Sequence, residues 1–318
     1  MKESYDTFKD ELLSLLESKL DPGYVLRTDT VTKNNGITKT GLAIRKGIEG
    51  VEISPTIYVE DLYESYNGYN MNAIADETYY NLTSTSDVSF DTSKVMTLDY
   101  VKENAYLKVI NTKANYEYLM DKPYYPVGGF EDLSAIIILR VEVNGEISGN
   151  TVVTDEMLEI LDLSKNELFE YAKTNSMSKE PASFKSMRDV LIETMGISEN
   201  DPMADMMLPP DDGMMNVLMN KSSYLGASTI MYDGVLDDIH SKLGEDFVII
   251  PSSIHEVIIL PKSKAPEKEE LLGMIRSIND GVVDPSDKLS DNAYMYSGAS
   301  ATVSMITDAG SGAGAAAE

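Results

Sequence analysis

Apolar positions at the start of the chain follow the spacing of an amphipathic helix. In residues 3–20 they recur every three or four residues, with charged residues between them. Asp21-Pro22-Gly23 ends this pattern, because proline cannot extend a helix and glycine accepts the left-handed conformation of a C-cap. Residues 24–31 and 37–44 are extended, and Asn34-Asn35-Gly36 between them supplies the positive φ of a tight turn. The chain is therefore predicted to open with a helix and a β-hairpin.

An internal similarity predicts two hairpin–helix units. GNTVVTDEMLEIL at 149–161 and ASTIMYDGVLDDI at 227–239 share the order strand, aspartate, amphipathic helix. The first follows the apolar strand 133–143 and a turn at Asn144-Gly145. The second is expected to contain strands at 215–220 and 225–232 and a helix at 234–243, with Asp233 as its cap. Other predicted elements are strands at 51–59, 105–111, 245–251, 255–261 and 292–297, and helices at 60–67, 71–83, 113–121 and 266–280, with a further helix begun by a capping box of Ser164 and Glu167.

These elements predict an α+β fold with antiparallel or mixed sheets and packed helices. We expect an N-terminal α+β region at 1–175 and a C-terminal α+β region at 215–297, which either form two domains or share one sheet. Between them, 176–214 is rich in acidic residues, methionine and proline, which is typical of a linker. A methionine-rich binding patch is the alternative for this segment. Residues 298–318 turn to glycine, alanine and serine, which predicts a disordered tail.

Composition excludes several classes of function. The chain has no cysteine, so it has no disulfide, thiolate metal site or cysteine nucleophile. No apolar run matches an export signal or a membrane span, so we expect a cytoplasmic protein that does not bind membranes. With 26 basic and 53 acidic residues, the net charge is 26 − 53 = −27, which disfavours direct binding of nucleic acid. This charge serves solubility or, alternatively, mimics nucleic acid as a decoy.

The candidates for chemistry are few. His255 follows Ser252 and Ser253 and precedes Glu256, which suggests a hydrolase or transferase in which His255 works with carboxylates. Against this, a serine two residues from a histidine on one extended segment is badly placed, and no G-x-S-x-G elbow occurs. The structural alternative is that the serines form a turn and His255 bonds a neighbouring backbone group. Ser252, Ser253 and His255 are the candidate binding residues, with His255 and Glu256 as weak catalytic candidates.

Metal and cofactor sites are not predicted. Aspartates and serines at 284–291 form a loose cation-loop pattern, but the spacing of a calcium loop is missing, and capping or turn roles fit better. No phosphate-binding loop or dinucleotide fingerprint follows a strand. We therefore expect no metal and no cofactor. The 19 tyrosines form the main compositional excess, clustered in ESYNGYN, ETYYNL and PYYP, and exposed tyrosines are good contact residues.

Five segments occur in order along roughly residues 3–297: KNNGITKTGLAIRK, ISPTIYVEDLYESYNGY, FEDLSAIIILR, YDGVLDDIHSKLGEDFVIIPSSIHEVIILP and LSDNAYMYS. In these segments the chain resembles a bacterial family of unknown function, numbered 5688 and frequent in clostridia. PSSIHEV is its most specific part. The resemblance implies a bacterial cytoplasmic protein with one shared architecture, and it carries no activity or site residues.

Three hypotheses for function follow. The leading one is a non-enzymatic binding protein with a protein partner, because catalytic motifs are missing and tyrosines are abundant. The second is an acidic inhibitor or decoy of a nucleic-acid-binding protein, which rests on the net charge of −27. The third is the hydrolase or transferase with His255.

Overall fold

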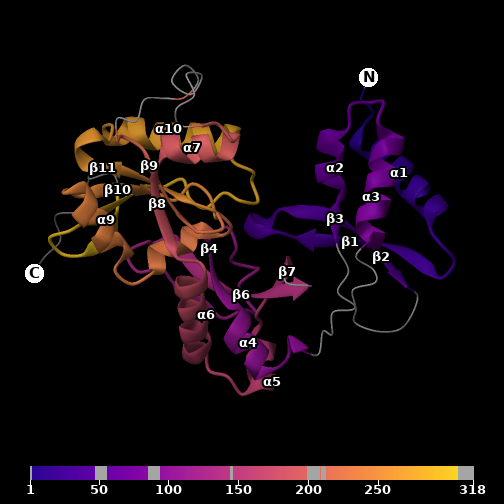
Figure 1. Ribbon diagram of the computed structural model, residues 1–318, viewed down its shortest axis with the longest axis horizontal. Helices are drawn as coiled ribbons and strands as arrows, with labels where there is room; N and C mark the ends of the chain where they lie inside the picture. The colour runs from indigo at the N-terminus through magenta and orange to yellow at the C-terminus, as the bar shows by residue number, and fades with distance from the viewer. Residues whose placement is uncertain are drawn as a thin grey trace, which may run out of the picture.

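In its described residues, the protein has an α+β fold of three antiparallel sheets packed with helices (Figure 1). The computed structural model describes residues 2–46, 56–84, 94–143, 146–198, 208 and 213–306. None of the helices in these described segments is long and apolar enough to cross a membrane.

The first sheet and its three helices form an N-terminal unit with a core of its own. The predicted opening is confirmed by α1 (Tyr5–Lys19) and by the antiparallel strands β1 (Tyr24–Thr32) and β2 (Thr38–Lys46). The short strand β3 (Ile57–Tyr58) pairs with β2, while residues 51–55 of the strand predicted there lie outside the described residues. The predicted helices follow as α2 (Val59–Ser65) and α3 (Met71–Ser84). This core buries Phe8, Leu12, Leu16, Leu42, Ile44, Val59, Ile74 and Leu82, among others.

The second sheet is built around its most apolar strand. β6 (Leu133–Val143) pairs with β4 (Ala105–Asn111) on one side and with β5 (Tyr124–Pro126) and β7 (Glu146–Val152) on the other. Helices α4 (Leu98–Asn104), α5 (Asp155–Leu161) and α6 (Lys165–Lys179) accompany these strands. The capping box of Ser164 and Glu167 at the start of α6 is confirmed, because each residue bonds the other's backbone N–H.

The helix predicted at 113–121 is wrong, since these residues form successive turns. The side chain of Asn111 accepts the N–H of Ala114 at 2.9 Å, and Asn115 Nδ2 donates to Asn111 O at 2.8 Å. Such local side-chain bonds offer the backbone an alternative to the helical ladder. Helix α4 and strand β5 were missed by the sequence patterns.

The third sheet has the order β13-β12-β10-β11-β9-β8. Strands β10 (Phe247–Ile250), β11 (Val257–Pro261) and β12 (Tyr294–Ser297) confirm the predicted strands, and α10 (Lys268–Gly281) confirms the predicted helix. Figure 1 shows α10 lying with α7 (Met187–Met195) along one side of this sheet. The second and third sheets share one continuous core, so residues 94–306 pack around a common apolar interior in their described parts.

The predicted linker 176–214 is not structureless in its described part. Residues 176–179 continue α6, β8 (Ala182–Ser186) pairs with β9 (Asn216–Asn220), and α7 follows β8. Polar composition suggested a linker, but β8 is an edge strand of the third sheet, where polar residues are ordinary. Residues 199–207 and 209–212 of this segment lie outside the described residues.

The second hairpin–helix unit differs from the prediction. Residues 226–231 form the 3₁₀ helix η3 rather than a strand, so β9 lacks the predicted hairpin partner. The helix α9 (Val235–Leu243) is confirmed, but its N-cap is Gly234, and Asp233 instead pairs with Lys173 at 2.6 Å. In the predicted disordered tail, β13 (Thr302–Met305) pairs with β12, while 307–318 lie outside the described residues.

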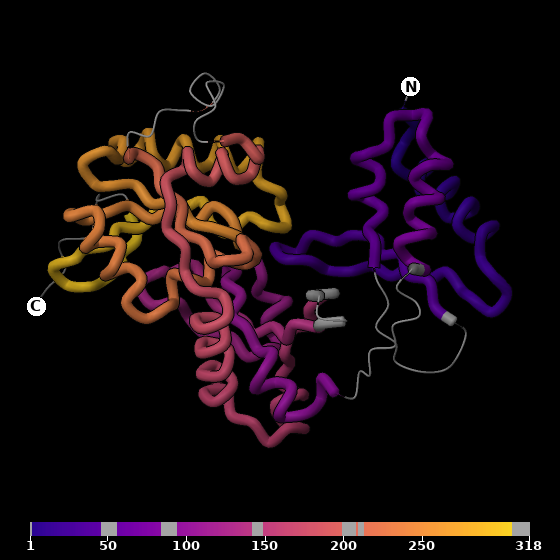
Figure 2. Tube along the Cα trace, in the orientation of Figure 1, coloured from indigo at the N-terminus to yellow at the C-terminus, as the bar shows by residue number. Residues whose placement is uncertain are grey.

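The N-terminal unit meets the rest of the protein at the tip of the β1–β2 hairpin, which reaches toward the main body in Figure 2. Asn35 Nδ2 donates to the carbonyl oxygens of Pro285 and Lys288, at 2.9 and 2.7 Å. Asn34 Nδ2 donates to Ser286 O at 2.9 Å. The predicted turn residues therefore have a second role, because they attach the hairpin to the loop 284–289.

Candidate functional site

Residues 251–256 of the PSSIHEV box form the loop between β10 and β11, and Val257 begins β11. Ser253 Oγ accepts the backbone N–H of His255 at 2.9 Å, which confirms the predicted serine turn. The loop is also held by backbone bonds to a neighbouring segment: Ile254 N donates to Asp287 O at 2.8 Å, and Leu289 N donates to Ser252 O at 2.9 Å. The box therefore anchors residues 287–289.

Both ring nitrogens of His255 have polar neighbours. Its Nδ1 accepts the backbone N–H of Leu225 at 3.2 Å, as the structural interpretation predicted. Because Nδ1 is the acceptor, Nε2 carries the proton in the neutral ring, and Nε2 lies 3.6 Å from Asp287 Oδ2. The ring also packs against Tyr224, with centroids 5.6 Å apart. His255 therefore joins its own loop to the loop of Leu225 and lies beside Asp287, and the N–H of Leu225 occupies the Nδ1 lone pair that a general base would use.

Glu256 follows His255 in the loop. Burial raises the pKa of its carboxyl, while His255 and Ser253 act in the opposite direction. Ser252 contributes its main chain to the loop contacts. The structure thus brings Ser253, His255 and Asp287 together and leaves Glu256 at their edge. It does not form the nucleophile–base pair that a hydrolase needs.

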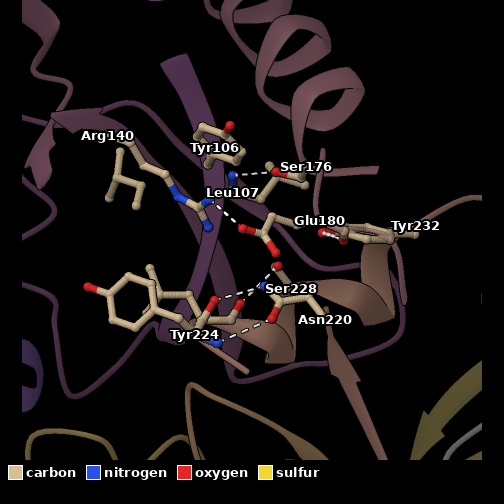
Figure 3. Close-up of a pocket in the computed structure, with 11 residues that line it drawn as sticks. Tyr106, Leu107, Arg140, Ser176, Glu180, Asn220, Tyr224, Ser228 and Tyr232 are labelled. Atoms are coloured by element: carbon tan, nitrogen blue, oxygen red, sulfur yellow. Dashed lines mark hydrogen bonds and ion pairs between the residues drawn. The ribbon is translucent and has the colours of Figure 1, made fainter. Parts of the chain in front are cut away.

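A small pocket centred on Arg140 lies next to this loop (Figure 3). Arg140 Nη1 donates to Glu180 Oε1 at 2.5 Å, and the two side chains are only 5% and 9% exposed. The other carboxylate oxygen of Glu180 accepts the backbone N–H of Ser222 at 3.1 Å. The guanidinium also lies 4.0 Å from the ring centroid of Tyr106, a cation–π contact. Among the described residues, Arg140 Nε has no hydrogen-bond partner.

Tyr224 connects the Arg140 pocket to His255. It lines the pocket, and its hydroxyl accepts Asn150 Nδ2 at 2.8 Å while its ring contacts His255. Asn220 holds the loop of Tyr224, because Asn220 Nδ2 donates to Tyr224 O at 2.8 Å. The ion pair of Arg140 and Glu180 fills the centre of the pocket (Figure 3). The polar contacts of the pocket hold β6, the end of α6 and the loop after β9 together.

Sequence reasoning did not find Arg140 or Glu180. The signal was present in AIIILR, because an arginine that continues a buried apolar strand needs a buried partner. The partner itself could not be read from the chain, since Glu180 lies 40 residues away among many carboxylates.

A second polar cluster lies at the hairpin tip. Asn35 N donates to Asn115 Oδ1 at 2.8 Å, and Asn111 Nδ2, at the end of β4, donates to Leu289 O at 3.0 Å. We call this place the hairpin junction: residues 33–36 of the tip, residues 108–115 at and after the end of β4, and the loop 284–289.

The acidic loop 284–291 behaves as a capped turn. Asp284 Oδ1 accepts both the N–H and the hydroxyl of Ser286, each at 2.7 Å. These bonds, with the nearby charge of Lys39, lower the pKa of Asp284 although burial opposes them. Over the part of the chain that the structure describes, no group of three or more histidine or acidic side chains is arranged to hold a metal ion.

Comparison with known proteins gives a family and no relative of known activity. No curated protein matches this chain, and neither does any solved structure. The family of unknown function DUF5688 matches residues 5–298, which include strands of all three sheets and end before β13. The chain therefore belongs to the DUF5688 family.

Proposed function

We propose that this chain is a non-enzymatic, cytoplasmic bacterial binding protein. The state of His255 carries the proposal. One nitrogen accepts the N–H of Leu225 and the other faces Asp287, so the residue best suited to acid–base chemistry is used to hold loops in place. A rigid polar frame of this kind favours binding, because the groups that meet a ligand are already positioned.

Exposed aromatic rings support a protein partner as a second part of the proposal. Tyr69, Tyr80 and Tyr116 are 87%, 68% and 71% exposed, although tyrosine rings are usually at least half covered in a folded protein. Tyrosine contributes large contact area with few rotatable bonds, so it is enriched where proteins associate.

The test compares turnover with retention. The full chain, at one hundredth of the concentration of the small molecules in a host extract, is incubated and followed by untargeted mass spectrometry. A binding protein retains at most one equivalent of any compound, and host proteins that remain with the immobilised chain identify a partner. Time-dependent loss of many equivalents of one compound, abolished in His255→Gln, would show an enzyme and refute the proposal. Failure to retain any compound or protein would also count against it.

The decoy interpretation rests on the net charge of −27 and stays a prediction. It requires acidic side chains gathered on one face. Several carboxylates of the described residues instead form ion pairs with nearby lysines, for example Asp61 with Lys39 and Glu193 with Lys185.

A further inference from the structure

Strand β1 forms a free edge of the N-terminal sheet. In the described part of the chain it pairs with β2 on one side and with no strand on the other. It is nine residues long, and its register with β2 runs without a shift from Tyr24 to Thr32. It contains no proline, and residues 27–30 are exposed to solvent. Natural proteins usually shorten, bend or cover such an edge, because its unpaired N–H and C=O groups can pair with another strand.

Alternate residues of β1 point their main-chain groups toward the open edge. Near the hairpin tip, Lys33 N donates to Ile37 O at 2.6 Å, so the main chain of Lys33 faces the other arm of the hairpin. Thr40, which lies opposite Thr30, donates its N–H to the carboxylate oxygens of Glu60 at 3.0 and 2.9 Å, so this pair is not bonded across the hairpin. Bonded and unbonded pairs alternate along an antiparallel ladder. The even-numbered residues of β1 therefore direct their N–H and C=O groups to the open edge, among them Leu26, Thr28 and Thr30.

The odd-numbered side chains of β1 lie on the face of the sheet that is turned away from the N-terminal core. Thr28 lies opposite Leu42, which belongs to that core, so the even-numbered side chains share the core side. Arg27 and Asp29 are therefore neighbours on the outer face, and both are exposed. Among the described residues, neither takes part in an ion pair. On the same face, the apolar side chain of Val25 is 49% exposed.

We propose that β1 pairs in antiparallel orientation with β1 of a second copy of this chain, about a two-fold axis at Thr28, to form a homodimer. In this register Thr28 faces Thr28 of the second copy and Leu26 faces Thr30, so the outward-facing residues of both strands meet as bonded pairs. Arg27 of each copy lies opposite Asp29 of the other, which gives two cross-strand pairs of opposite charge. The two three-stranded sheets join into one of six strands, and both free β1 edges disappear.

Charge selects this register over its neighbours. Main-chain bonding requires that outward-facing residues lie opposite one another, so the two-fold axis must pass through a residue and not between two. An axis one residue earlier would place Arg27 opposite Arg27, and one residue later it would place Asp29 opposite Asp29. Like charges directly opposite one another are destabilising. With the axis at Thr28, each charge faces its opposite and Val25 faces Val31, so the strand is complementary to itself, as a two-fold contact requires.

The net charge of −27 on each chain opposes this association at low salt. At about 0.15 M ionic strength the screening length is about 8 Å, so the charges that meet at β1 attract while distant charges are largely screened. Antiparallel pairing also puts the two hairpin tips, which contact the main bodies (Figure 2), at opposite ends of the joined strands. The dimer goes beyond the proposed binding function and does not depend on a ligand or on another protein.

The test is sedimentation velocity of the full chain at about 0.15 M salt over a range of concentrations. We expect the wild type to form a dimer as the concentration rises. Arg27→Glu and Asp29→Arg each put like charges opposite one another twice in the dimer, so each should weaken it roughly tenfold or more. Glu170→Arg is the matched control, because it makes the same change of charge as Asp29→Arg at an exposed position of α6, and it should dimerise as the wild type does.

Mixing the Arg27→Glu and Asp29→Arg variants gives a second test that a folding defect cannot imitate. In the mixture, positions 27 and 29 of the two different chains carry opposite charges at both contacts, so a mixed dimer should form at a concentration where each variant alone is monomeric. In the wild type, amide hydrogen exchange of Leu26, Thr28 and Thr30 should slow as the concentration rises, while that of Arg27, whose N–H faces β2, should change less. A wild type that stays monomeric, variants that dimerise as it does, no mixed dimer, or exchange independent of concentration would each overturn the proposal.

Discussion

Removing the charge of Glu180 should destabilise the protein strongly, because it leaves Arg140 buried without a counter-charge. The two side chains are 5% and 9% exposed and 2.5 Å apart, so solvent screens their attraction little. At an effective dielectric constant of about 20, two charges about 4 Å apart attract by roughly 4 kcal/mol, and breaking a buried pair usually costs about 3–5 kcal/mol. In Glu180→Gln the amide oxygen still accepts the N–H of Ser222, so we expect about 3 kcal/mol.

The assay is urea unfolding followed by near-ultraviolet circular dichroism of the tyrosines, since the chain has no tryptophan. The matched control is Glu193→Gln, which breaks an ion pair with Lys185 whose side chains are 37% and 58% exposed. Exposed pairs contribute about 0.2–1 kcal/mol, so this variant should unfold almost as the wild type does. The double variant Arg140→Met with Glu180→Leu should recover most of the loss, because no charge remains buried. A loss in Glu180→Gln no larger than in Glu193→Gln would refute the reasoning.

Three further predictions concern backbone fit, the hairpin junction and pH. Gly129→Ala should lower the free energy of unfolding in urea by at least about 2 kcal/mol, because Gly129 has φ +79° and an added Cβ would lie 2.5 Å from a carbonyl oxygen of β13. Gly128→Ala is the control and should be near neutral, since an added Cβ there meets open space. Equal costs for the two variants would contradict this prediction. Asn35→Gly keeps the positive φ of 61° but loses the side-chain bonds to the loop 284–289. Amide hydrogen exchange should therefore become faster in this loop and stay unchanged in α1. Unchanged exchange in the loop as well as in α1 would contradict the prediction. The pKa of Lys108 is lowered from 10.5 to about 8, so the folded state binds fewer protons than the unfolded state between these values, and stability should rise with pH across them. Lys108→Met should remove that rise and increase the free energy of unfolding at pH 7 by about 1–3 kcal/mol. Parallel pH profiles of stability in the wild type and the variant would exclude the effect.

Sequence patterns located the elements whose apolar residues face one core. The strand predicted at 105–111 matches β4 and the strand predicted at 133–143 matches β6, because continuous apolar runs of that length have few other places in a fold. The sequence patterns gave a wrong prediction for residues 225–232, because these residues are apolar as a result of their burial in and around η3 and do not form a strand. Periodicity reports how buried a segment is, and burial alone does not distinguish a strand from a short helix.

The candidate site was found in part. The PSSIHEV box drew attention to His255, and its predicted bond to a neighbouring backbone group is confirmed. The pairing of Arg140 with Glu180 and the bonds of Asn34 and Asn35 to the loop 284–289 join residues far apart in sequence. No local pattern encodes such contacts, because they depend on how the sheets and the hairpin pack.

The attachment of the hairpin has a consequence for how the family can vary. Asn34 and Asn35 donate to three main-chain carbonyl oxygens of the loop 284–289, and no side chain of that loop takes part in these bonds. A loop recognised through its backbone keeps its anchor when its side chains are replaced, provided that its path is preserved. Substitution can therefore change the charge around the junction without detaching the N-terminal unit.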